Sequence, residues 1–432
     1  MPTLSAPRSP DIEKIRFPAF AALRHRDFRL LWLGQIVSVT GSQMQLTALH
    51  WHIWLLSKSA LALGMLGLFR GAPIILCSLM GGVFADAVDR KRLMIVMQTV
   101  MLGSATCLTI ATLAGLKHIW PIYLLTAVAS AATAFDTPAR QSLMPSLVPA
   151  RDFPNAVSLG VTVFYVAMIG GPALAGFLLA SHGPALIYGL NSASFLSVIA
   201  ALLLIRTSGR PVPGDEGKTT RVSFGALKDG LRFVWRTPII VQTMTLDFAA
   251  TFFASATALL PIFADKILVV GARGYGFLSA APALGAVITG LVMARIGTFR
   301  NQGKLIIVSV GIFGLTTIAF GLSRVFWFSL LMLALSGAAD TVSTVLRQTI
   351  RQLSTPDQLR GRMTSINMVF FMGGPQLGEV EAGSVAALIG APLSVVTGGI
   401  GSVLAAVIAM FKAKSLIAYD GVSSEKDTAN QE

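Results

Sequence analysis

Five ionisable side chains lie inside long apolar runs of the sequence, and these are Arg70, Asp247, Asp340, Glu379 and Glu381. A charged group in apolar surroundings is costly unless it finds a partner of opposite charge. A buried carboxyl group can also carry a proton, because desolvation and neighbouring charges decide when it ionises. The chemistry that these residues offer is therefore ion pairing in an apolar medium and proton transfer.

The composition of the 432-residue chain identifies that medium. Hydrophobic residues make up 54% of it, and charged residues only 12%, against about 25% in soluble domains. A soluble fold has too few polar groups here to cover its surface. The two cysteines, Cys77 and Cys107, form no metal-ligand or disulfide pattern. We expect the solvent for most of the chain to be a lipid bilayer, and we expect no metal and no cofactor.

Apolar runs of sufficient length to cross a bilayer as helices, about 20 residues each, occur twelve times. They lie at 29–54, 60–85, 93–115, 120–137, 155–180, 185–205, 238–264, 275–296, 304–323, 327–347, 363–388 and 393–412. The predicted fold is an all-α membrane protein with twelve transmembrane helices.

A polar stretch divides these spans into two groups of six. Residues 206–237 are rich in Pro, Gly and charge, and a helix lying on the membrane surface is expected at 222–235. The predicted organisation is therefore a terminal segment, a six-helix half, this central loop, a second six-helix half and a tail, with bounds at 1–28, 29–205, 206–237, 238–412 and 413–432.

The two predicted halves repeat each other in sequence. Trp120 and Arg140 have counterparts 207 positions later, in Trp327 and Arg347. Two six-helix repeats in parallel are typical of transporters that rock about a central site.

The basic residues predict the orientation of the chain. With both termini in the cytoplasm, 28 of the 34 Lys and Arg residues lie in or beside cytoplasmic segments, as the positive-inside rule requires. The net charge of +14 is explained by this placement, so nucleic-acid binding is not needed to account for it.

Glycine, acidic and basic residues cluster where the second span ends, in the run Gly81-Gly82-Val-Phe-Ala-Asp86-Ala-Val-Asp89-Arg90-Lys-Arg. This run resembles the signature loop of the major facilitator superfamily, G-x-x-x-D-x-x-G-R-[KR], with Asp89 in place of the last glycine. Segments 135–141, 170–176 and 373–383 resemble the bacterial exporter branch that contains enterobactin exporters and macrolide efflux proteins. The resemblance covers nearly the whole chain and implies the fold of that superfamily.

The resemblance also implies a gating latch on the cytoplasmic side, formed by Asp86, Arg90 and Asp136. Physically, Gly82 allows close helix packing, and Asp86 is placed to cap the eleventh span, which starts near Arg362. In the second half, Ala294 stands where the acid is expected. The corresponding latch is therefore predicted to be weaker.

The intramembrane charges are expected to pair by depth. Arg70 lies about 22 Å from the cytoplasmic end of the second span and Glu379 about 24 Å from the start of the eleventh. The superfamily fold places these two helices side by side, which predicts an Arg70–Glu379 pair. Glu381 points about 200° away from Glu379, and either one remains open as the residue that faces the cavity. Asp247, about 13 Å into the seventh span, is the alternative proton carrier.

Three further features can be explained by structure as well as by function. Asp340 has Arg347 within reach and is expected to be structural. His50 and His52 are expected at the membrane interface, while the polar residues of the first span are expected to line a water-filled cavity. The motifs expected to kink or pack helices are Gly171, Pro172 and Gly176 in the fifth span and Gly374, Pro375 and Gly378 in the eleventh.

The function that these features predict is secondary transport, not catalysis. We expect a monomer in the bacterial inner membrane that exports a hydrophobic or amphipathic small molecule, such as a siderophore or drug, by proton antiport. A nutrient or lysolipid importer on the same fold is one alternative. A membrane sensor or assembly factor that has lost transport is the other. The sequence contains no P-loop, so ATP is not expected to drive the chain.

Overall fold

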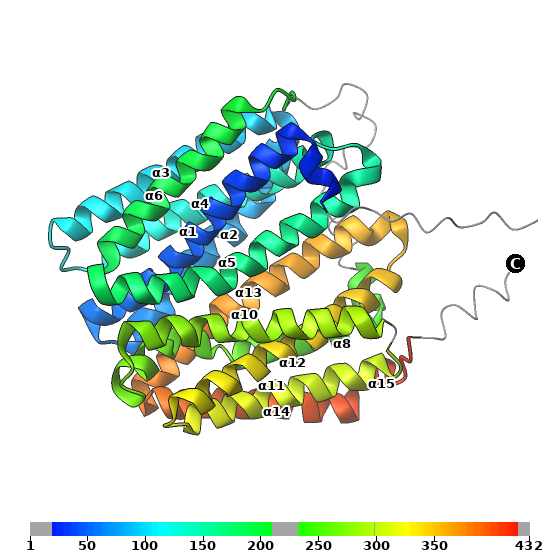
Figure 1. Cartoon of the computed structure of the whole chain (residues 1–432). Coiled ribbons are helices and arrows are strands. Elements are labelled where there is room, and N and C mark those ends of the chain that lie inside the picture. The colour runs from blue at the N-terminus through cyan, green and yellow to red at the C-terminus, as the bar shows by residue number, and fades with distance from the viewer. Residues whose placement is uncertain (1–19, 210–231, 298, 422–432) are drawn as a thin grey trace, which may run out of the picture.

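We analysed a computed structural model, in which residues 20–209, 232–297 and 299–421 are described (Figure 1). Side chains are described for these residues except 78–87 and, within 357–372, all but Leu359, Met363 and Asn367. The described residues form helices and turns, with no strand. Nine segments of the described chain are long and apolar enough to cross a membrane. The all-α membrane fold predicted from the sequence is confirmed.

Six long helices precede the central loop. They are α1 (Arg26–Ser57), α2 (Ala60–Ala87), α3 (Arg90–Leu113), α4 (Trp120–Leu143), α5 (Phe153–His182) and α6 (Pro184–Leu204). Within this first bundle α1 packs on α5 and α6, α3 on α4 and α6, and α2 on α4.

Helical segments also fill the described chain after the loop. They are α8 (Pro238–Phe253), α9 (Leu260–Ile262), α10 (Gly271–Ile296), α11 (Gln302–Leu322), α12 (Phe326–Leu353), α13 (Asp357–Ile389), α14 (Ala391–Lys412) and α15 (Lys414–Ile417). Within this second bundle α12 packs on α10 and α11, α14 on α11, and α8 on α13 and α14. Counting α8 and α9 as one span, the long segments are consistent with the twelve predicted spans.

The seventh span is broken, although the sequence predicted one continuous run over 238–264. α8 ends at Phe253, a short 3₁₀ turn covers Ala256–Leu259, and α9 leads into a π-helical turn at Phe263–Ile267. Such π turns are rare and are often found at functional positions. The helical path therefore extends three residues past the predicted end and includes Asp265.

Asp89 shows why the signature loop tolerates an acid in place of glycine. It is the N-cap of α3, and its side chain accepts a hydrogen bond of 3.1 Å from the backbone N–H of Arg92. Aspartate is among the preferred N-cap residues because it satisfies an N–H that has no partner within the helix. The surface helix expected at 222–235 lies mostly outside the described residues, of which 232–236 are helical.

The two bundles lie one above the other in Figure 1, with both ends of the described chain on the same side. We call the membrane face where α1 begins and α14 ends the terminal face, and the opposite one the far face. The main contacts between bundles join α2 to α13 and α5 to α10. Any relative movement of the bundles must occur across these two helix pairs.

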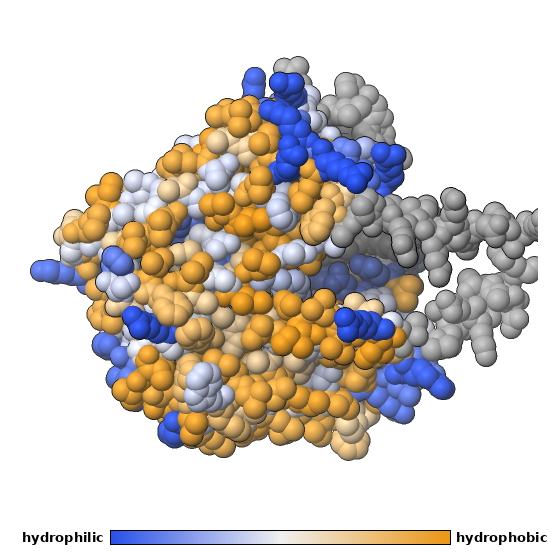
Figure 2. Space-filling view, viewed as in Figure 1, coloured by the Kyte–Doolittle hydropathy of each residue, from blue (hydrophilic) through white to orange (hydrophobic). Residues whose placement is uncertain are grey.

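The apolar core is shared between the bundles only near the far face. One cluster of buried residues includes Trp54 and Leu66 from the first bundle and Phe263 and Tyr275 from the second. At the terminal face the clusters that the described residues form each stay within one bundle. Figure 2 shows hydrophilic atoms set back between the bundles on that side. The described structure is therefore closed at the far face and recessed at the terminal face.

Candidate functional site

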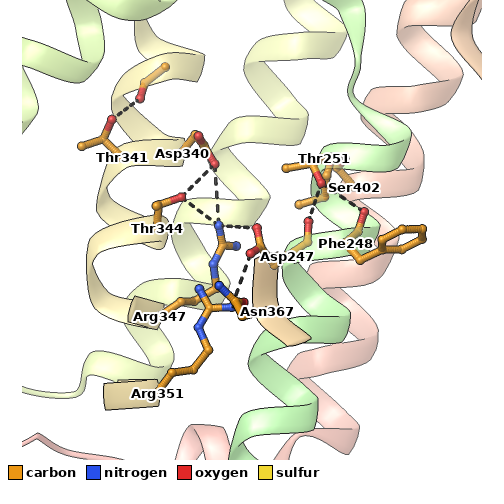
Figure 3. A network of polar contacts seen from close by, with 12 residues as sticks. Asp247, Phe248, Thr251, Asp340, Thr341, Thr344, Arg347, Arg351, Asn367 and Ser402 are labelled. Atoms are coloured by element: carbon orange, nitrogen blue, oxygen red, sulfur yellow. Dashed lines mark hydrogen bonds and ion pairs between the residues drawn. The ribbon is translucent and has the colours of Figure 1, made fainter. Parts of the chain in front are cut away.

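A buried ionic network lies inside the second bundle, where α8, α12 and α13 meet (Figure 3). Oδ1 of Asp247 on α8 lies 2.8 Å from Nη2 of Arg347, and Oδ2 lies 3.5 Å from Nη1 of Arg351. Arg351 also donates to the side-chain oxygen of Asn367. Arg347 is fully buried, which makes its neutralisation by Asp247 essential.

Asp340 belongs to the edge of this network. It lies 3.7 Å from Nη2 of Arg347, and 43% of its side chain is exposed. Thr344 bridges the two, because its hydroxyl contacts both Asp340 and Arg347. The expected contact between Asp340 and Arg347 is present, but Asp247 provides the shorter pairing.

A network of polar side chains occupies the corresponding place in the first bundle. Arg140 of α4, the sequence counterpart of Arg347, donates to the amide oxygen of Gln35 on α1. Asp136 is buried and accepts a hydrogen bond of 3.0 Å from Gln98 on α3. Gln45 of α1 similarly bonds Asn191 of α6. These α1 amides therefore connect helices within the bundle, and the cavity lining expected for the other polar residues of the first span stays a prediction.

Arg70 and Glu379 meet between the bundles. Nη1 of Arg70 on α2 lies 3.8 Å from Oε1 of Glu379 on α13. The helices approach closely because Gly67 of α2 faces Glu379, and a Cβ added at Gly67 would lie 2.8 Å from the carboxylate. The pairing expected from equal depth is thus present in the structure. It joins one bundle to the other, unlike the Asp247 network.

Glu379 retains unused hydrogen-bonding capacity. Its Oε2 is buried and has no hydrogen-bond partner among the described atoms, and the same holds for Nε2 of His50 on α1. His50, Arg70 and Glu379 lie close enough to interact electrostatically, and Tyr275 of α10 is also near Glu379. Helices of both bundles therefore surround one carboxylate that is only partly satisfied.

The two histidines are buried in the protein, so their expected place at the membrane interface is wrong. His50 is 7% and His52 5% exposed. His52 contacts the hydroxyl of Tyr188 at 3.2 Å. Burial follows because the far-face half of α1 is enclosed by helices of both bundles.

Glu381 is half-buried and has no ion-pair partner in the described part of the chain. Gly374 and Gly378, which were expected to pack helices, lie against Thr251 and Phe252 of α8. The carbonyl of Pro375 accepts a hydrogen bond of 3.1 Å from Ser255. This motif of α13 therefore fastens α13 to α8 inside the second bundle.

The Gly171, Pro172 and Gly176 motif of α5 contacts helices of both bundles. Gly171 packs on α1, where a Cβ would lie 2.6 Å from the Cβ of Gln43. Gly176 packs on Gly276 of α10, and a Cβ on either would approach the other's backbone within 3 Å. Pro172 lies inside the helix between these contacts. The glycines thus permit one close approach within the bundle and one between bundles.

The predicted latch is described only in part. Gly82 and Asp86 belong to residues 78–87, whose side-chain contacts are not described. Arg90 donates to the carbonyl of Ser142 at 3.1 Å, which ties the start of α3 to the end of α4. Asp136 has Gln98 as its hydrogen-bond partner, so the role of these residues as one latch stays a prediction.

A polar contact that was not predicted from the sequence joins the bundles at the far face. Asp265 in the π turn accepts hydrogen bonds from Trp54 at 2.8 Å and from Lys58 at 3.0 Å. Lys58 and Lys266 both lie about 5 Å from the ring of Trp54 and make cation–π contacts. The end of α1 is therefore held to the broken seventh span.

Two helical bundles that pack through glycine contacts and share an ion pair at their interface are the arrangement of a secondary transporter. The family described as transmembrane secretion effectors matches residues 17–430, and the chain belongs to this family of the major facilitator superfamily.

Relatives and solved structures agree with this assignment. The enterobactin exporter EntS of Salmonella choleraesuis (strain SC-B67) is 26% identical over 388 residues, covering 88% of this chain and 90% of that protein. EntS of Escherichia coli O1:K1 / APEC is 25% identical over 392 residues, covering 89% and 91%.

Among solved structures, a bacterial homologue of the iron transporter ferroportin in an inward-facing state superposes with a TM-score of 0.66 at 16% identity, covering 91% of this chain and 99% of that one. A bacterial homologue of the lysosomal transporter Spinster, inward-facing and unoccupied, gives 0.71 at 14%, covering 91% and 98%. These structures support the fold, and the chain is a multi-pass membrane transporter.

Proposed function

We propose that this transporter exports a hydrophobic or amphipathic small molecule across the bacterial cytoplasmic membrane in exchange for protons, and that it acts as a monomer. The similarity to enterobactin exporters supports export and makes a siderophore-like compound the first substrate to test. In this proposal both termini are cytoplasmic, so the terminal face is the inner face. The recess at that face then corresponds to a state open to the cytoplasm.

The observation that carries the proposal is the position of the Arg70–Glu379 pair. Arg70 belongs to the first bundle and Glu379 to the second. Residues 29–205 and 238–412 are proposed to rock as two bodies, and rocking changes the distance between these two side chains. A carboxylate that loses a neighbouring cation in apolar surroundings favours its protonated form. Movement of the bundles and proton uptake at Glu379 are thereby linked.

Asp247 fits this role less well because its partners move with it. Arg347 and Arg351 belong to the same bundle as Asp247 and lie within 3.5 Å of it. Rigid-body rocking leaves those distances unchanged. We therefore assign Asp247 to the stability of the second bundle and Glu379 to coupling.

The exchange proceeds through one proton on Glu379. With the far face open, the proton enters from outside and binds a carboxylate oxygen as the ion pair separates. With the terminal face open, Arg70 returns to Glu379, the proton leaves to the cytoplasm, and substrate binds for export. Asp86, Arg90 and Asp136 are proposed to hold the terminal face closed in the other half of the cycle.

Proton release on substrate addition tests the coupling. Purified wild type in weakly buffered detergent is mixed with enterobactin, and the pH is followed. Glu379→Gln is expected to bind the compound without releasing a proton, while the matched control Glu381→Gln releases it as wild type does. Undiminished release from Glu379→Gln would refute its role and direct the search to Asp247→Asn.

Accumulation in cells tests direction separately. Cells that express the chain should hold less enterobactin than cells without it, and a protonophore should abolish the difference. Higher accumulation in the expressing cells would favour import on the same fold.

A further inference from the structure

A groove of about 510 Å³ runs between α8 and α14 of the second bundle. Its lining includes Val241, Leu246 and Phe253 from α8, and Leu404, Ile408 and Lys412 from α14. Leu404 is 54% and Ile408 55% exposed. In a membrane transporter, large exposed apolar side chains on such a face contact lipid.

The groove exists because small residues line its centre. Ala249 lies on α8, and Gly401, Ala405 and Ala409 lie on α14. Larger side chains at these positions would fill the space between the helices. The result is a narrow apolar channel, open to the bilayer, whose width is set by backbone and methyl groups.

The length of the groove matches one leaflet. Gly401 and Lys412 are eleven residues apart on α14, or about 16 Å along the helix. The hydrocarbon core of a bilayer is about 30 Å thick, so the groove extends from the terminal face to about the middle of the membrane. One acyl chain of a lipid in that leaflet covers the same depth.

The charge in the groove lies at one end. Lys412 is the only charged residue of the lining, is exposed, and is the last residue of α14 at the terminal face. Gln242, also at this end, is occupied, because its amide oxygen accepts the backbone N–H of Leu416 at 2.9 Å. Lys412 has no ion pair with a described residue, so its ammonium group can meet an anion at the depth of lipid headgroups.

We propose that this groove binds an anionic phospholipid of the leaflet at the terminal face, with one acyl chain along α8 and α14 and the phosphate beside Lys412. Charge complementarity and length select this occupant. The transported compound is less suited to it, since the groove is lined by one side of α8, while Asp247 points from the other side of α8 to Arg347 inside the bundle. The inference does not depend on the direction of transport or on its coupling.

Binding of defined lipids to the full chain tests the proposal. Delipidated protein in detergent is titrated with phosphatidylglycerol or phosphatidylcholine, and bound lipids are counted by native mass spectrometry. Wild type is expected to bind one phosphatidylglycerol more tightly than any phosphatidylcholine. Lys412→Gln should weaken that binding about fivefold, since a basic residue near the membrane surface contributes about that factor to anionic lipid binding. Ala405→Phe, which fills the groove, should abolish it.

Arg29→Gln is the matched control, because Arg29 is exposed near the terminal face of α1 in the other bundle. It should leave the tight phosphatidylglycerol site unchanged. Equal binding of the two lipids, or an equal loss in Arg29→Gln and Lys412→Gln, would overturn the proposal and indicate annular lipid only. Displacement of the lipid by enterobactin from the Lys412 site would also overturn it, by making the groove a substrate site. Lys412 is exposed, so this variant remains informative if Ala405→Phe fails to fold.

Discussion

The two bundles place the same arginine near the end of their fourth helix and satisfy it in different ways. In the first bundle Arg140 donates to the amide of Gln35 and has Asp136 within electrostatic reach, while in the second Arg347 forms a close ion pair with Asp247 (Figure 3). Arg140 is partly exposed and Arg347 is fully buried. A guanidinium that keeps contact with solvent accepts a neutral partner, whereas a fully enclosed one needs a counter-charge.

This difference extends to the rest of each network. The first bundle joins its helices with amides and hydroxyls, such as Gln45 with Asn191. The second concentrates two arginines and two carboxylates at one place. We infer that the second bundle depends on its charges for stability, and that the first tolerates substitutions at its polar contacts.

Loss of the carboxylate at Asp247 should have the largest effect. Asp247→Asn leaves Arg347 and Arg351 without their main counter-charge, and breaking one side of a buried pair costs about 3–5 kcal/mol. Chemical unfolding of the purified protein measures this change in the free energy of unfolding. Asp340→Asn is the control, because that side chain is 43% exposed and should cost much less. Similar values for the two variants would contradict the comparison.

The matching change in the first bundle should be milder. Gln35→Leu removes the acceptor of Arg140, and the loss of a hydrogen bond to a charged group costs about 1.5–3 kcal/mol. The partial exposure of Arg140 places the result at the lower end, because water replaces the lost acceptor. The same unfolding assay applies. A cost as large as that of Asp247→Asn would show that both arginines need their partners equally.

Substitutions in the predicted latch should reduce transport in the first bundle but not at the corresponding position of the second. Asp86→Asn is expected to reduce transport with little loss of folded protein, and its combination with substitutions of Arg90 or Asp136 should be non-additive. In the second bundle Ala294 occupies the corresponding position, so Ala294→Ser should leave transport near wild type. Strictly additive losses among the first three residues would argue against a shared latch.

Adding a carboxylate beside Arg140 in the first bundle should have a small effect on stability. Gln35→Glu gives Arg140 a charged partner like that of Arg347. Because Arg140 keeps contact with solvent, the new pair should change the free energy of unfolding by about 1 kcal/mol or less. A larger stabilisation would mean that Arg140 is more isolated from water than its exposure indicates.

Cysteine labelling of the segments between helices tests the orientation of the chain in the membrane. These substitutions should leave stability unchanged. In a chain whose two native cysteines are replaced, a cysteine at Val269, which is 77% exposed at the far face, should react with an impermeant reagent added to whole cells. A cysteine at Ser208, at the end of the first bundle, should react only after permeabilisation. Labelling of Ser208 in intact cells would reverse the proposed topology.

The sequence predicts the spans from local rules, and it predicts the contact between Arg70 and Glu379 from their depths together with the helix order of the superfamily that the chain resembles. Twenty apolar residues define a span, and the rise per residue gives the depth of each charge within it. The partners of Asp247 depend on which helices pack together, and spacing along the chain does not contain that information. A signal was nevertheless present, since Arg347 and Arg351 are one helical turn apart and Arg347 repeats Arg140.

Asp265 was missed, and His50 was placed wrongly, for a different reason. Asp265 lies one residue past the predicted end of the seventh span, and the π turn that brings it to Trp54 has no recognisable sequence pattern. His50 was placed by its distance from the end of α1, whereas the packing of both bundles at the far face determines its burial.

The two residues of the ion pair between the bundles are synthesised at different times. Arg70 leaves the ribosome 309 residues before Glu379, which at about 5–20 residues per second is a wait of roughly 15–60 s. During that time α2 is already in the membrane with an arginine and without the carboxylate that pairs with it. The insertion machinery, or a temporary partner within the unfinished protein, must shelter this helix until α13 arrives. A ribosome stalled between the two halves would therefore expose the nascent transporter to membrane quality control.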